Sequence, residues 1–412
     1  MEQWKKYKLG DICKTNIAQY SAKENWDSVT YLDTGNITRN KINALQLIDD
    51  VANSLPIRAR RKVKHNDIIY STVRPDQCHF GILQNPDERM LVSTGFTVIT
   101  TKKHVVHPFY LYYYLTQQHI TNHLHSIGEQ SVSTYPSIKP SDIESIDIYI
   151  PIYPEQKRIA DILKSLDDKI ELNRQINDNL EQQAQALFKS WFVDFEPFKD
   201  GKFIDSELGL IPEGWRVGTL SELGEVIGGG TPSKAKEDEY YTDNGIPWLT
   251  PKDMSILNLK FVSKGNIDIT TIGYKNSSAK VMPKGSVLFS SRAPIGYIAI
   301  AKTKICTNQG FKSIIPQNAG TGFIYYFLKN STPNIESQAT GSTFKEASGS
   351  LMKSLKVTIA HRTVLNDFES IVASIFAKQE KNESENQNLE RLRDTLLPKL
   401  MSGELKINDL NS

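Results

Sequence analysis

One helical pattern occurs twice in this chain, as EQKRIADILKSLDDKIELNRQINDNLEQQAQALFKSW at residues 155–191 and VLNDFESIVASIFAKQEKNESENQNLERLRDTLLPKL at residues 364–400. In both copies the seam residues recur at alternating spacings of four and three, which is the heptad pattern of helices packed side by side. The chain is therefore an internal duplication with two long helices. The first seam is Ile159, Leu163, Leu166, Ile170, Asn173, Asn177, Leu180, Ala184, Leu187 and Trp191, and the second is Phe368, Val372, Ile375, Gln379, Asn382, Asn386, Leu389, Arg393, Leu396 and Leu400.

Both seams carry two asparagines near the middle of the helix, Asn173 and Asn177 in the first and Asn382 and Asn386 in the second. A buried amide costs stability, and it is tolerated where it fixes the register, because a slipped alignment would leave it without a partner. If the helices are antiparallel, the two asparagine pairs come together. The sequence therefore predicts an antiparallel coiled coil with facing amides.

The duplication extends beyond the helices. Each half begins with a tryptophan, Trp4 or Trp215, and continues to a β-rich run that ends in arginine and proline, at residues 63–75 and 281–294. The predicted fold class is α+β, with two globular domains related by a pseudo-twofold axis and joined by the two helices. The predicted segments are a first globular domain at 1–151, a helical spacer at 152–205, a second globular domain at 206–359 and a second helical spacer at 360–412.

Composition and length agree with two domains plus connecting helices. The chain has 412 residues, of which 39% are hydrophobic and 23% charged. It contains no apolar run of the ~18 residues that a membrane span requires, and its start lacks the apolar stretch of a signal peptide. Three isolated cysteines, Cys13, Cys78 and Cys306, favour neither a disulfide framework nor a cysteine zinc site. A cytoplasmic protein is expected.

Charge is distributed unevenly although the net charge is only +2. Residues 1–150 hold 17 Lys/Arg against 15 Asp/Glu, and residues 202–359 hold 18 against 13, whereas the helical segments 151–201 and 360–412 are both net acidic. Contacts with a polyanion, if any, belong to the globular domains. Ordinary variation among solvated faces is the alternative explanation.

Several motifs follow one another in a fixed order: IPIYPEQKRIA (150–160), LFKSWFVDF (187–195), GGTPS (229–233), GIPWLT (245–250), RAPIG (292–296), NQGF (308–311) and LRDTLLPKLMSGEL (392–405). With these motifs the chain resembles the specificity (S) subunits of type I restriction-modification enzymes, and the resemblance covers essentially all 412 residues.

The resemblance implies a non-catalytic subunit with two target-recognition domains that read the two parts of an asymmetric, bipartite site in double-stranded DNA. The paired helices would space these domains and dock two modification (M) subunits. The M subunits would use S-adenosylmethionine to methylate adenine, and restriction (R) subunits would add cleavage driven by ATP and magnesium. No cofactor, no metal and no membrane is expected for this chain itself.

Helix length gives a scale for such a spacer. A helix of about 37 residues spans roughly 55 Å at ~1.5 Å per residue, which corresponds to on the order of 16 base pairs of B-DNA at ~3.4 Å per base pair. Two domains held that far apart would contact the duplex more than one helical turn apart.

Two other classes of function stay open. One is a self-contained restriction or modification enzyme, and the other is a scaffold whose domains bind proteins. Against an enzyme, the sequence has no adenine-methyltransferase Asn/Asp-Pro-Pro-Tyr motif, no dinucleotide-binding glycine fingerprint and no P-loop lysine.

Candidate DNA contacts in the first domain lie in a basic run and at the end of a predicted strand. The run alternates along a strand, so only about half of its cations could share one face, and a charged edge strand that prevents aggregation is the alternative. Arg74 and Arg292 are predicted to occupy equivalent positions in the two domains, where each could bind guanine or phosphate or pin a loop. The candidates of the first domain are Arg58, Arg60, Arg61, Lys62, Lys64 and Arg74.

Candidates in the second domain surround the glycines at 228–230, where a backbone could closely approach a phosphate. Loop flexibility is the alternative for the glycines. Asn and Gln pair well with adenine, although they are also common turn formers. The candidates of the second domain are Thr231, Ser233, Lys234, Lys252, Lys280, Lys284, Arg292, Asn308 and Gln309.

Two further groups of residues have other candidate roles. His119 and His123, four residues apart, could face one metal, but no third ligand is evident and a packing or surface role is favoured. Trp191, Phe192 and Phe195 end the first helix as an apolar cluster. Core packing is the favoured role for this cluster, and docking of a partner subunit is the alternative.

Overall fold

The computed structural model describes residues 4–130, 136–341 and 345–407. It divides into two compact units, which we call unit 1 (Met1–Ile170 with Asn388–Ser412) and unit 2 (Glu171–Gln387). Each unit therefore combines one predicted recognition domain with a part of both predicted helices.

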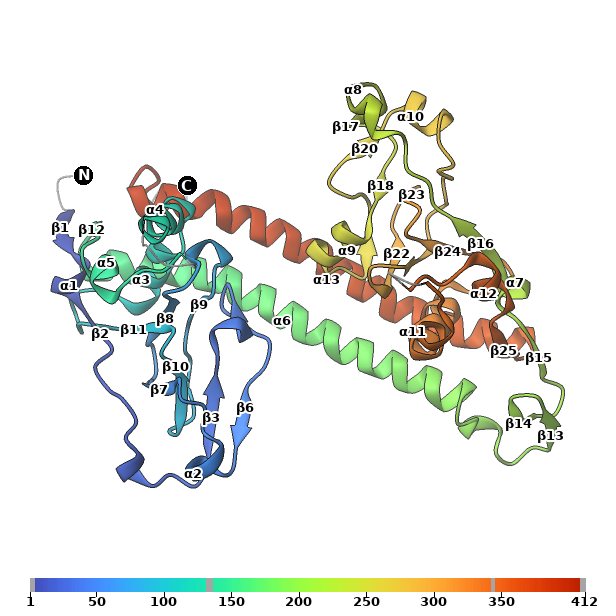
Figure 1. Cartoon of the computed structure of the whole chain (residues 1–412), viewed down its shortest axis with the longest axis horizontal. Coiled ribbons are helices and arrows are strands. Elements are labelled where there is room, and N and C mark those ends of the chain that lie inside the picture. Colours follow the sequence, from blue (N-terminus) through green and yellow to red (C-terminus); the bar gives the residue numbers. More distant parts are fainter. Residues whose placement is uncertain (1–3, 131–135, 342–344, 408–412) are drawn as a thin grey trace. The chain divides into compact units, whose positions relative to one another are not determined.

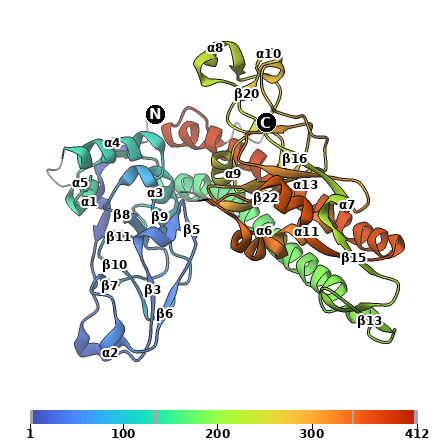
Figure 2. The same cartoon turned by 45° about the vertical axis from the view of Figure 1, so that its right-hand side comes forward.

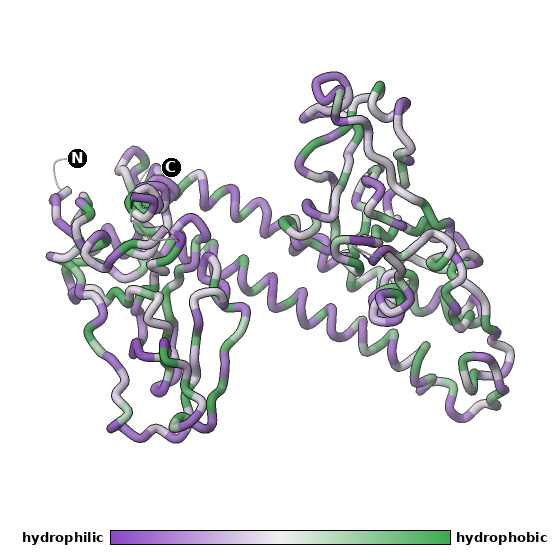
Figure 3. Tube along the Cα trace, in the orientation of Figure 1, coloured by the Kyte–Doolittle hydropathy of each residue, from purple (hydrophilic) through white to green (hydrophobic). Residues whose placement is uncertain are grey.

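The two predicted helices are confirmed as α6 (Tyr153–Phe192) and α13 (Arg362–Ser402), which are 40 and 41 residues long (Figure 1). Their bounds lie within two residues of the predicted ones, and none of the predicted seam residues is exposed. Hydrophobic and hydrophilic residues alternate along both helices (Figure 3), as expected when one stripe of each helix is buried.

Facing amides in unit 2 confirm the predicted antiparallel register. Asn173 Nδ2 donates to Asn386 Oδ1 at 2.9 Å, and Asn382 Nδ2 donates to Asn177 Oδ1 at 2.8 Å. The side chain of Gln379 adds a hydrogen bond to the Asn177 carbonyl oxygen at 3.0 Å. Residue numbers rise along α6 as they fall along α13, so the helices are antiparallel.

Helix pairing in unit 1 depends on a charged contact instead of amides. Arg393 Nη1 lies 2.8 Å from Asp167 Oδ1, and the second carboxylate oxygen accepts a hydrogen bond from the Tyr113 hydroxyl at 2.7 Å. The same carboxylate thus joins α6, α13 and α3 (Pro108–Leu115). Apolar seam residues Leu163 and Leu400 are completely buried beside it.

Unit 1 contains two four-stranded sheets, ordered β6-β3-β10-β7 and β2-β11-β8-β9, and an antiparallel pair β1-β12. Figure 2 shows that α2 lies at one end of the first sheet. The strands are β1 (Lys5–Lys8), β2 (Cys13–Thr15), β3 (Val29–Leu32), β4 (Ile37–Thr38), β5 (Lys41–Ile42), β6 (Gln46–Ile48), β7 (Ala59–Lys62), β8 (Ile68–Ser71), β9 (Phe80–Ile82), β10 (Met90–Ser93), β11 (Phe96–Thr101) and β12 (Asp147–Ile150). The remaining helices are α1 (Leu9–Ile12), α2 (Val51–Ser54), α4 (Gln118–Glu129) and α5 (Pro140–Glu144).

Unit 2 is built on a five-stranded sheet ordered β16-β24-β21-β22-β19. Its strands are β16 (Gly224–Gly228), β19 (Phe261–Val262), β21 (Val287–Ser291), β22 (Ile295–Ala301) and β24 (Lys312–Pro316). The other strands are β13 (Phe203–Ser206), β14 (Gly209–Pro212), β15 (Arg216–Thr219), β17 (Tyr241–Thr242), β18 (Trp248–Leu249), β20 (Asp268–Ile269), β23 (Cys306–Thr307) and β25 (Lys356–Ile359). The helices are α7 (Leu220–Leu223), α8 (Glu237–Tyr240), α9 (Pro251–Leu257), α10 (Thr271–Lys275), α11 (Thr321–Gln338) and α12 (Gly349–Ser354).

The same strand order recurs in both units. Strands β2-β11-β8-β9 of unit 1 correspond to β16-β24-β21-β22 of unit 2, and every neighbouring pair with a printed register is antiparallel in both. The parallel pair β10-β3 matches β23-β18, and β1-β12 matches β15-β25. The central strands β8 and β21 are buried along their whole length, which explains why each begins with a run of apolar and aromatic residues before its buried terminal serines. The duplication inferred from sequence is thus confirmed at the level of sheet topology.

The aromatic cluster at the end of α6 packs into the core of unit 2. Phe192 is 7% exposed, and its ring lies 4.8 Å from Phe323 and 5.0 Å from Phe368. Trp191 packs on Phe368, and Phe195 packs on Trp215. The favoured core role agrees with this packing, and it leaves Phe192 no surface for a partner. Among the described residues, no helix is long and apolar enough to cross a membrane.

Candidate nucleic-acid interface

Two glycines after β16 allow three backbone segments of unit 2 to meet. A Cβ on Gly229 would lie 1.8 Å from the Asn308 carbonyl oxygen, and a Cβ on Gly230 would lie 2.2 Å from the Ala279 nitrogen. Real Cβ atoms do not approach other atoms so closely, so only glycine fits at these positions. The Trp248 indole N–H fixes the loop by donating to the Gly230 carbonyl oxygen at 3.0 Å.

The turn at residues 308–310 packs directly against this glycine loop. Asn308 Oδ1 accepts a hydrogen bond from the Gly310 amide at 2.9 Å, which shapes the turn. The Thr231 hydroxyl donates to the side-chain oxygen of Gln309, so the two loops are joined by their side chains as well. Lys252 lies in the first turn of α9, next to Pro251, whose ring touches Gly310.

Most predicted contacts of the second domain are therefore brought together at one end of the five-stranded sheet. Lys280 joins them because it follows Ala279, which packs on the glycine loop. The side chains in this group provide cations, hydroxyls and amides, and most of them are exposed. We call this group the unit 2 loop cluster, and its members are Thr231, Ser233, Lys234, Lys252, Lys280, Asn308 and Gln309.

Arg292 lies beside the loop cluster but is engaged by a carboxylate. Its guanidinium group lies 3.6 Å from Glu346, which also pairs with Lys312 at 3.0 Å. The Ser291 amide donates to the Gly310 carbonyl oxygen at 2.7 Å and so ties this end of β21 to the turn. This ion pair agrees with a loop-pinning role for Arg292. Its contact with DNA stays a prediction, since a guanidinium group has five N–H donors and one carboxylate does not use all of them.

Lys284 is separated from the other candidates of the second domain. It precedes β21, whereas Arg292 and the loop cluster lie at the opposite end of that strand. Five strand residues at ~3.3 Å each put roughly 17 Å between the two ends. The structure therefore does not bring Lys284 into the loop cluster.

The predicted equivalence of Arg74 and Arg292 is wrong by one residue. Val73 forms a bridge with Ser137, and Arg292 forms the corresponding bridge with Glu346. Arg74 instead matches Ala293, and both have a left-handed backbone, with φ of 47° and 49°. Sequence alignment on the arginine-proline motif missed this shift, because only the hydrogen bonds between strands fix the register.

Unit 1 places Arg58 and Arg74 near one turn, at residues 93–95. The Thr94 amide donates to the Arg58 carbonyl oxygen at 2.8 Å, and the Thr72 amide donates to the Gly95 carbonyl oxygen at 2.8 Å. The second of these bonds corresponds to the bond between Ser291 and Gly310 in unit 2. Both arginines are exposed.

The remaining cations of the basic run have separate local roles. Lys62 forms an ion pair with Glu24 and lies 4.9 Å from the centre of the Trp26 ring. Arg61 is partly buried, and burial lowers its pKa. Their strand, β7, is last in the order of its sheet, but it is not a solvated edge: the Tyr20 amide donates to the Arg60 carbonyl oxygen at 2.8 Å and the Lys62 amide donates to the Ala18 carbonyl oxygen at 3.2 Å. Arg60 donates to the Ile57 carbonyl oxygen at 3.2 Å. Lys64 is exposed and follows β7, whereas Arg58 precedes this strand.

The histidines offer no metal site. His119 and His123 are both exposed on α4, and within residues 4–130, 136–341 and 345–407 no group of three His, Cys, Asp or Glu side chains is arranged to hold a metal ion. Two residues that are not among the predicted contacts, Glu346 and Lys312, lie next to Arg292. Nothing in the local sequence marks Glu346, because its partners lie far away along the chain.

Comparisons with known proteins agree on one family. The model of the type I restriction modification DNA specificity domain matches residues 1–182 and 212–391. The specificity subunit of the type I restriction enzyme HindI from Haemophilus influenzae is 31% identical, over 98% of this chain and all of that relative. The specificity subunit of MjaIX from Methanocaldococcus jannaschii is 37% identical, over 46% of this chain and 44% of the relative.

A solved structure shares the fold. The crystal structure of a type I restriction-modification S subunit from M. genitalium has a TM-score of 0.57 and 16% sequence identity, with 96% of each chain covered.

Proposed function

Since this chain belongs to the family of type I restriction-modification DNA specificity subunits, we propose that its two units read two different half-sites of one asymmetric DNA sequence. Specificity subunits are the non-catalytic component of type I systems, so the chemistry belongs to other subunits of the complex.

One observation carries this proposal. Both units present a turn and an arginine at the same end of the same sheet, but the side chains on the turn differ. In the middle of this turn, unit 1 has the exposed hydroxyl of Thr94 where unit 2 has the exposed amide of Gln309, whereas Ser93, at the position of Asn308, is completely buried. Hydroxyls and amides present different hydrogen-bond patterns to base edges, and an amide suits adenine. The two units thus share one backbone arrangement but carry different side chains on it, which supports two half-sites of different sequence.

Each type of residue has its own part in the proposed reading. Lys234, Lys252 and Lys280 would contact phosphates, which gives affinity and position without sequence information. Asn308 and Gln309 would contact base edges, with Thr231 orienting Gln309. In unit 1, Arg58 and Arg74 are the best placed candidates for the same work.

The proposed complex contains two M subunits docked on the helices and R subunits for cleavage. S-adenosylmethionine, ATP and magnesium would be bound by those partners and not by this chain. The proposed compartment is the cytoplasm, where DNA and both nucleotide cofactors occur together.

Methylome sequencing of cells that express this chain with its modification subunit is the decisive experiment. We expect methylated adenines within one bipartite asymmetric motif. A motif that disappears when this chain is omitted supports the proposal, and an unchanged methylome overturns it. Methylation or cleavage by the purified chain alone would establish the self-contained enzyme instead. Equal binding of all duplexes by the complex, under competition at physiological salt, would favour the scaffold.

Two lysines in the same unit give a matched test of the interface. Lys280→Met should weaken binding to all duplexes and reduce the salt slope by about one, because one phosphate contact is lost. Lys284→Met should leave both unchanged, since Lys284 lies beyond the other end of β21. Fluorescence anisotropy of the complex across salt concentrations measures both quantities. An equal effect of the two substitutions would contradict the assigned interface.

A further inference from the structure

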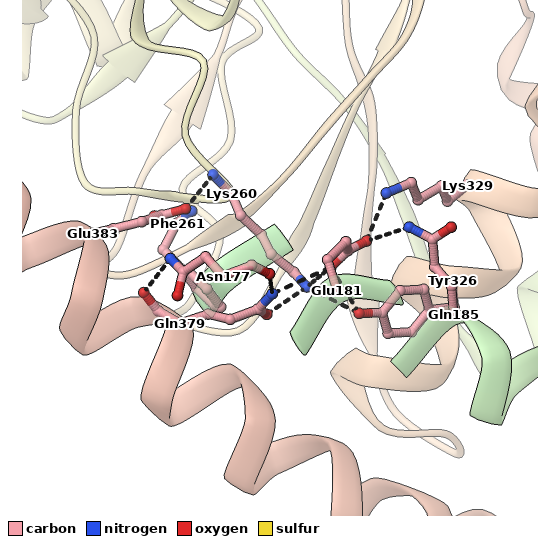
Figure 4. A network of polar contacts seen from close by, with 9 residues as sticks. All are labelled: Asn177, Glu181, Gln185, Lys260, Phe261, Tyr326, Lys329, Gln379 and Glu383. Carbon is pink, nitrogen blue, oxygen red and sulfur yellow. Dashed lines mark hydrogen bonds and ion pairs between the residues drawn. The ribbon is translucent and has the colours of Figure 1, made fainter. Parts of the chain in front are cut away.

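Lys260, the residue before β19, buries its charge among the helices of unit 2. Its side chain is 9% exposed, and its ammonium group lies 2.6 Å from Glu181 on α6. It also donates to Gln379 Oε1 on α13 at 2.9 Å and to the Tyr326 hydroxyl on α11 at 3.0 Å (Figure 4). An ammonium group has three N–H donors, and here all three have acceptors on three different helices.

Aromatic rings enclose the same ammonium group. The centres of the Phe376 and Tyr325 rings lie 4.0 and 4.5 Å from Nζ, and the Tyr326 ring lies 5.1 Å away. A cation over aromatic faces is held more strongly when water is excluded. Burial thus favours one position of the Lys260 side chain, provided that Glu181 balances its charge.

The backbone at this point is anchored to α13 as well. Glu383 accepts hydrogen bonds from the amides of Lys260 and Phe261, at 3.0 and 3.1 Å (Figure 4). Lys302, directly after the neighbouring strand β22, donates to Ser384 Oγ at 2.9 Å. One edge of the five-stranded sheet is therefore fixed to the helices through both side chains and backbone.

We propose that Lys260 is a positioning residue that fixes the orientation of the second recognition domain on its helices and thereby sets the spacer length that the complex accepts between half-sites. This inference rests on the proposed function. Strand β19 is one edge of the sheet, and the glycine loop of the interface follows β16 at the other edge. A continuous hydrogen-bonded sheet is stiff, so an orientation fixed at β19 is transmitted to the loop cluster.

Lys329 provides the matched control. It pairs with the same carboxylate of Glu181 at 2.6 Å, but its side chain is 38% exposed and it lies on α11. Exposed ion pairs contribute little, whereas removal of one partner from a buried pair leaves an uncompensated charge. If the buried anchor is what matters, Lys260→Met and Lys329→Met should therefore behave differently.

The test uses the complex of this chain with its modification subunits and duplexes whose spacer is the recognised length, one base pair shorter or one base pair longer. We expect Lys260→Met to reduce the preference for the recognised spacer by about tenfold, equivalent to 1.4 kcal/mol. Discrimination between bases inside the second half-site should stay, because the loop cluster is intact. Lys329→Met should change neither quantity.

The variant Lys260→Met with Glu181→Met should restore part of the spacer preference, since it also removes the carboxylate that would keep only the partly exposed Lys329 as its cationic partner. If the Lys260→Met complex does not assemble, Tyr326→Phe provides the test instead. It removes a single hydroxyl from the network, so it should reduce the spacer preference less than Lys260→Met would. An unchanged spacer preference in the assembled Lys260→Met complex, or in Tyr326→Phe, overturns the inference. If the wild-type complex showed no sequence preference at all, the proposed function itself would be contradicted.

The charge state of the network gives a second, pH-dependent test. Burial alone would raise the pKa of Glu181, but Lys260 and Lys329 outweigh it and lower that pKa from the ordinary 4.5 to about 2. Burial lowers the pKa of Lys260 to about 8 despite Glu181, so the pair is charged at neutral pH. The other ionisable groups facing it are Tyr325 and Tyr326 on α11 and Glu383 on α13.

A depressed carboxyl pKa contributes stability that is complete above pH 4.5 and is lost as pH falls toward 2. We therefore expect the unfolding free energy of the wild-type chain to fall more steeply over this range than that of Glu181→Gln. The exposed carboxylate Asp178, on the same helix, is the control, and Asp178→Asn should follow the wild type. Denaturant titrations at several pH values measure these slopes, and parallel slopes for Glu181→Gln and wild type would count against a charged network.

Discussion

Replacing Gly229 by alanine should lower the affinity of the complex for its DNA site by about a hundredfold, which corresponds to roughly 3 kcal/mol. The new Cβ would lie 1.8 Å from the Asn308 carbonyl oxygen. Backbone atoms cannot yield as a flexible side chain would, so the glycine loop and the turn at 308–310 must separate. The lysines and amides of the loop cluster would then lose their common position. Competition binding with the recognised duplex measures the loss.

Gly228 is the matched control, one residue earlier, at the end of β16. A Cβ there would meet nothing within 4 Å, so Gly228→Ala should bind DNA as the wild type does. Assembly with the modification subunits should be normal for both variants, because neither glycine lies on the helices. Equal affinities of the two variants would show that the close approach of the loops has no part in reading DNA.

Replacing Phe368 by alanine should destabilise unit 2 by about 3–5 kcal/mol, the usual cost of removing a large buried aromatic ring. Phe368 is completely buried on α13 and contacts Trp191, Phe188 and Phe192 of α6. Its loss leaves a cavity where the two helices and the second domain meet. Urea unfolding followed by tryptophan fluorescence measures the change, since Trp191 lies against the missing ring.

Ile371 tests whether this cost comes from burial. It lies three residues further along α13 and is 44% exposed. Ile371→Ala should change the unfolding free energy by no more than about 0.5 kcal/mol. A comparable loss for both variants would mean that a weaker helix, and not the lost core contact, causes the destabilisation.

Periodic features of this protein are predictable from sequence, because a heptad pattern that repeats five times leaves few alternatives to a long packed helix. The helices, their antiparallel direction and the meeting of the two asparagine pairs are predictable in this way, whereas the individual partners, such as Asn173 with Asn386, come from the structure. The duplicated domain was also accessible, since the two copies carry similar motifs in the same order.

Features that depend on one distant contact could not be predicted. The one-residue shift between Arg74 and Arg292 follows from the bridges of Val73 with Ser137 and of Arg292 with Glu346. No local sequence pattern indicates these bridges. Lys62 is a predicted DNA contact, and its pairing with Glu24 and packing on Trp26 could not be foreseen from sequence. Single charged residues are ambiguous in this way because their role depends on which carboxylate the fold brings beside them.

Lys260 is the clearest example of this limit. In sequence it is one lysine among many, and nothing near it suggests burial. Its partners come from α6, α11 and α13, at separations of 66 to 119 residues. Glu181 directly follows the seam residue Leu180. Only the folded structure shows that its side chain contacts the second domain.

The facing amides have a consequence for how such a protein could arise. Asn386 and Asn382 correspond, 209 residues earlier, to Asn177 and Asn173. The contacts Asn173–Asn386 and Asn177–Asn382 thus equal Asn173–Asn177 and Asn177–Asn173 between two copies of the first helix. Such a helix is complementary to itself when it runs backwards. An ancestor of half this length could therefore have worked as a homodimer, and fusion of two genes would then have let each half evolve its own target.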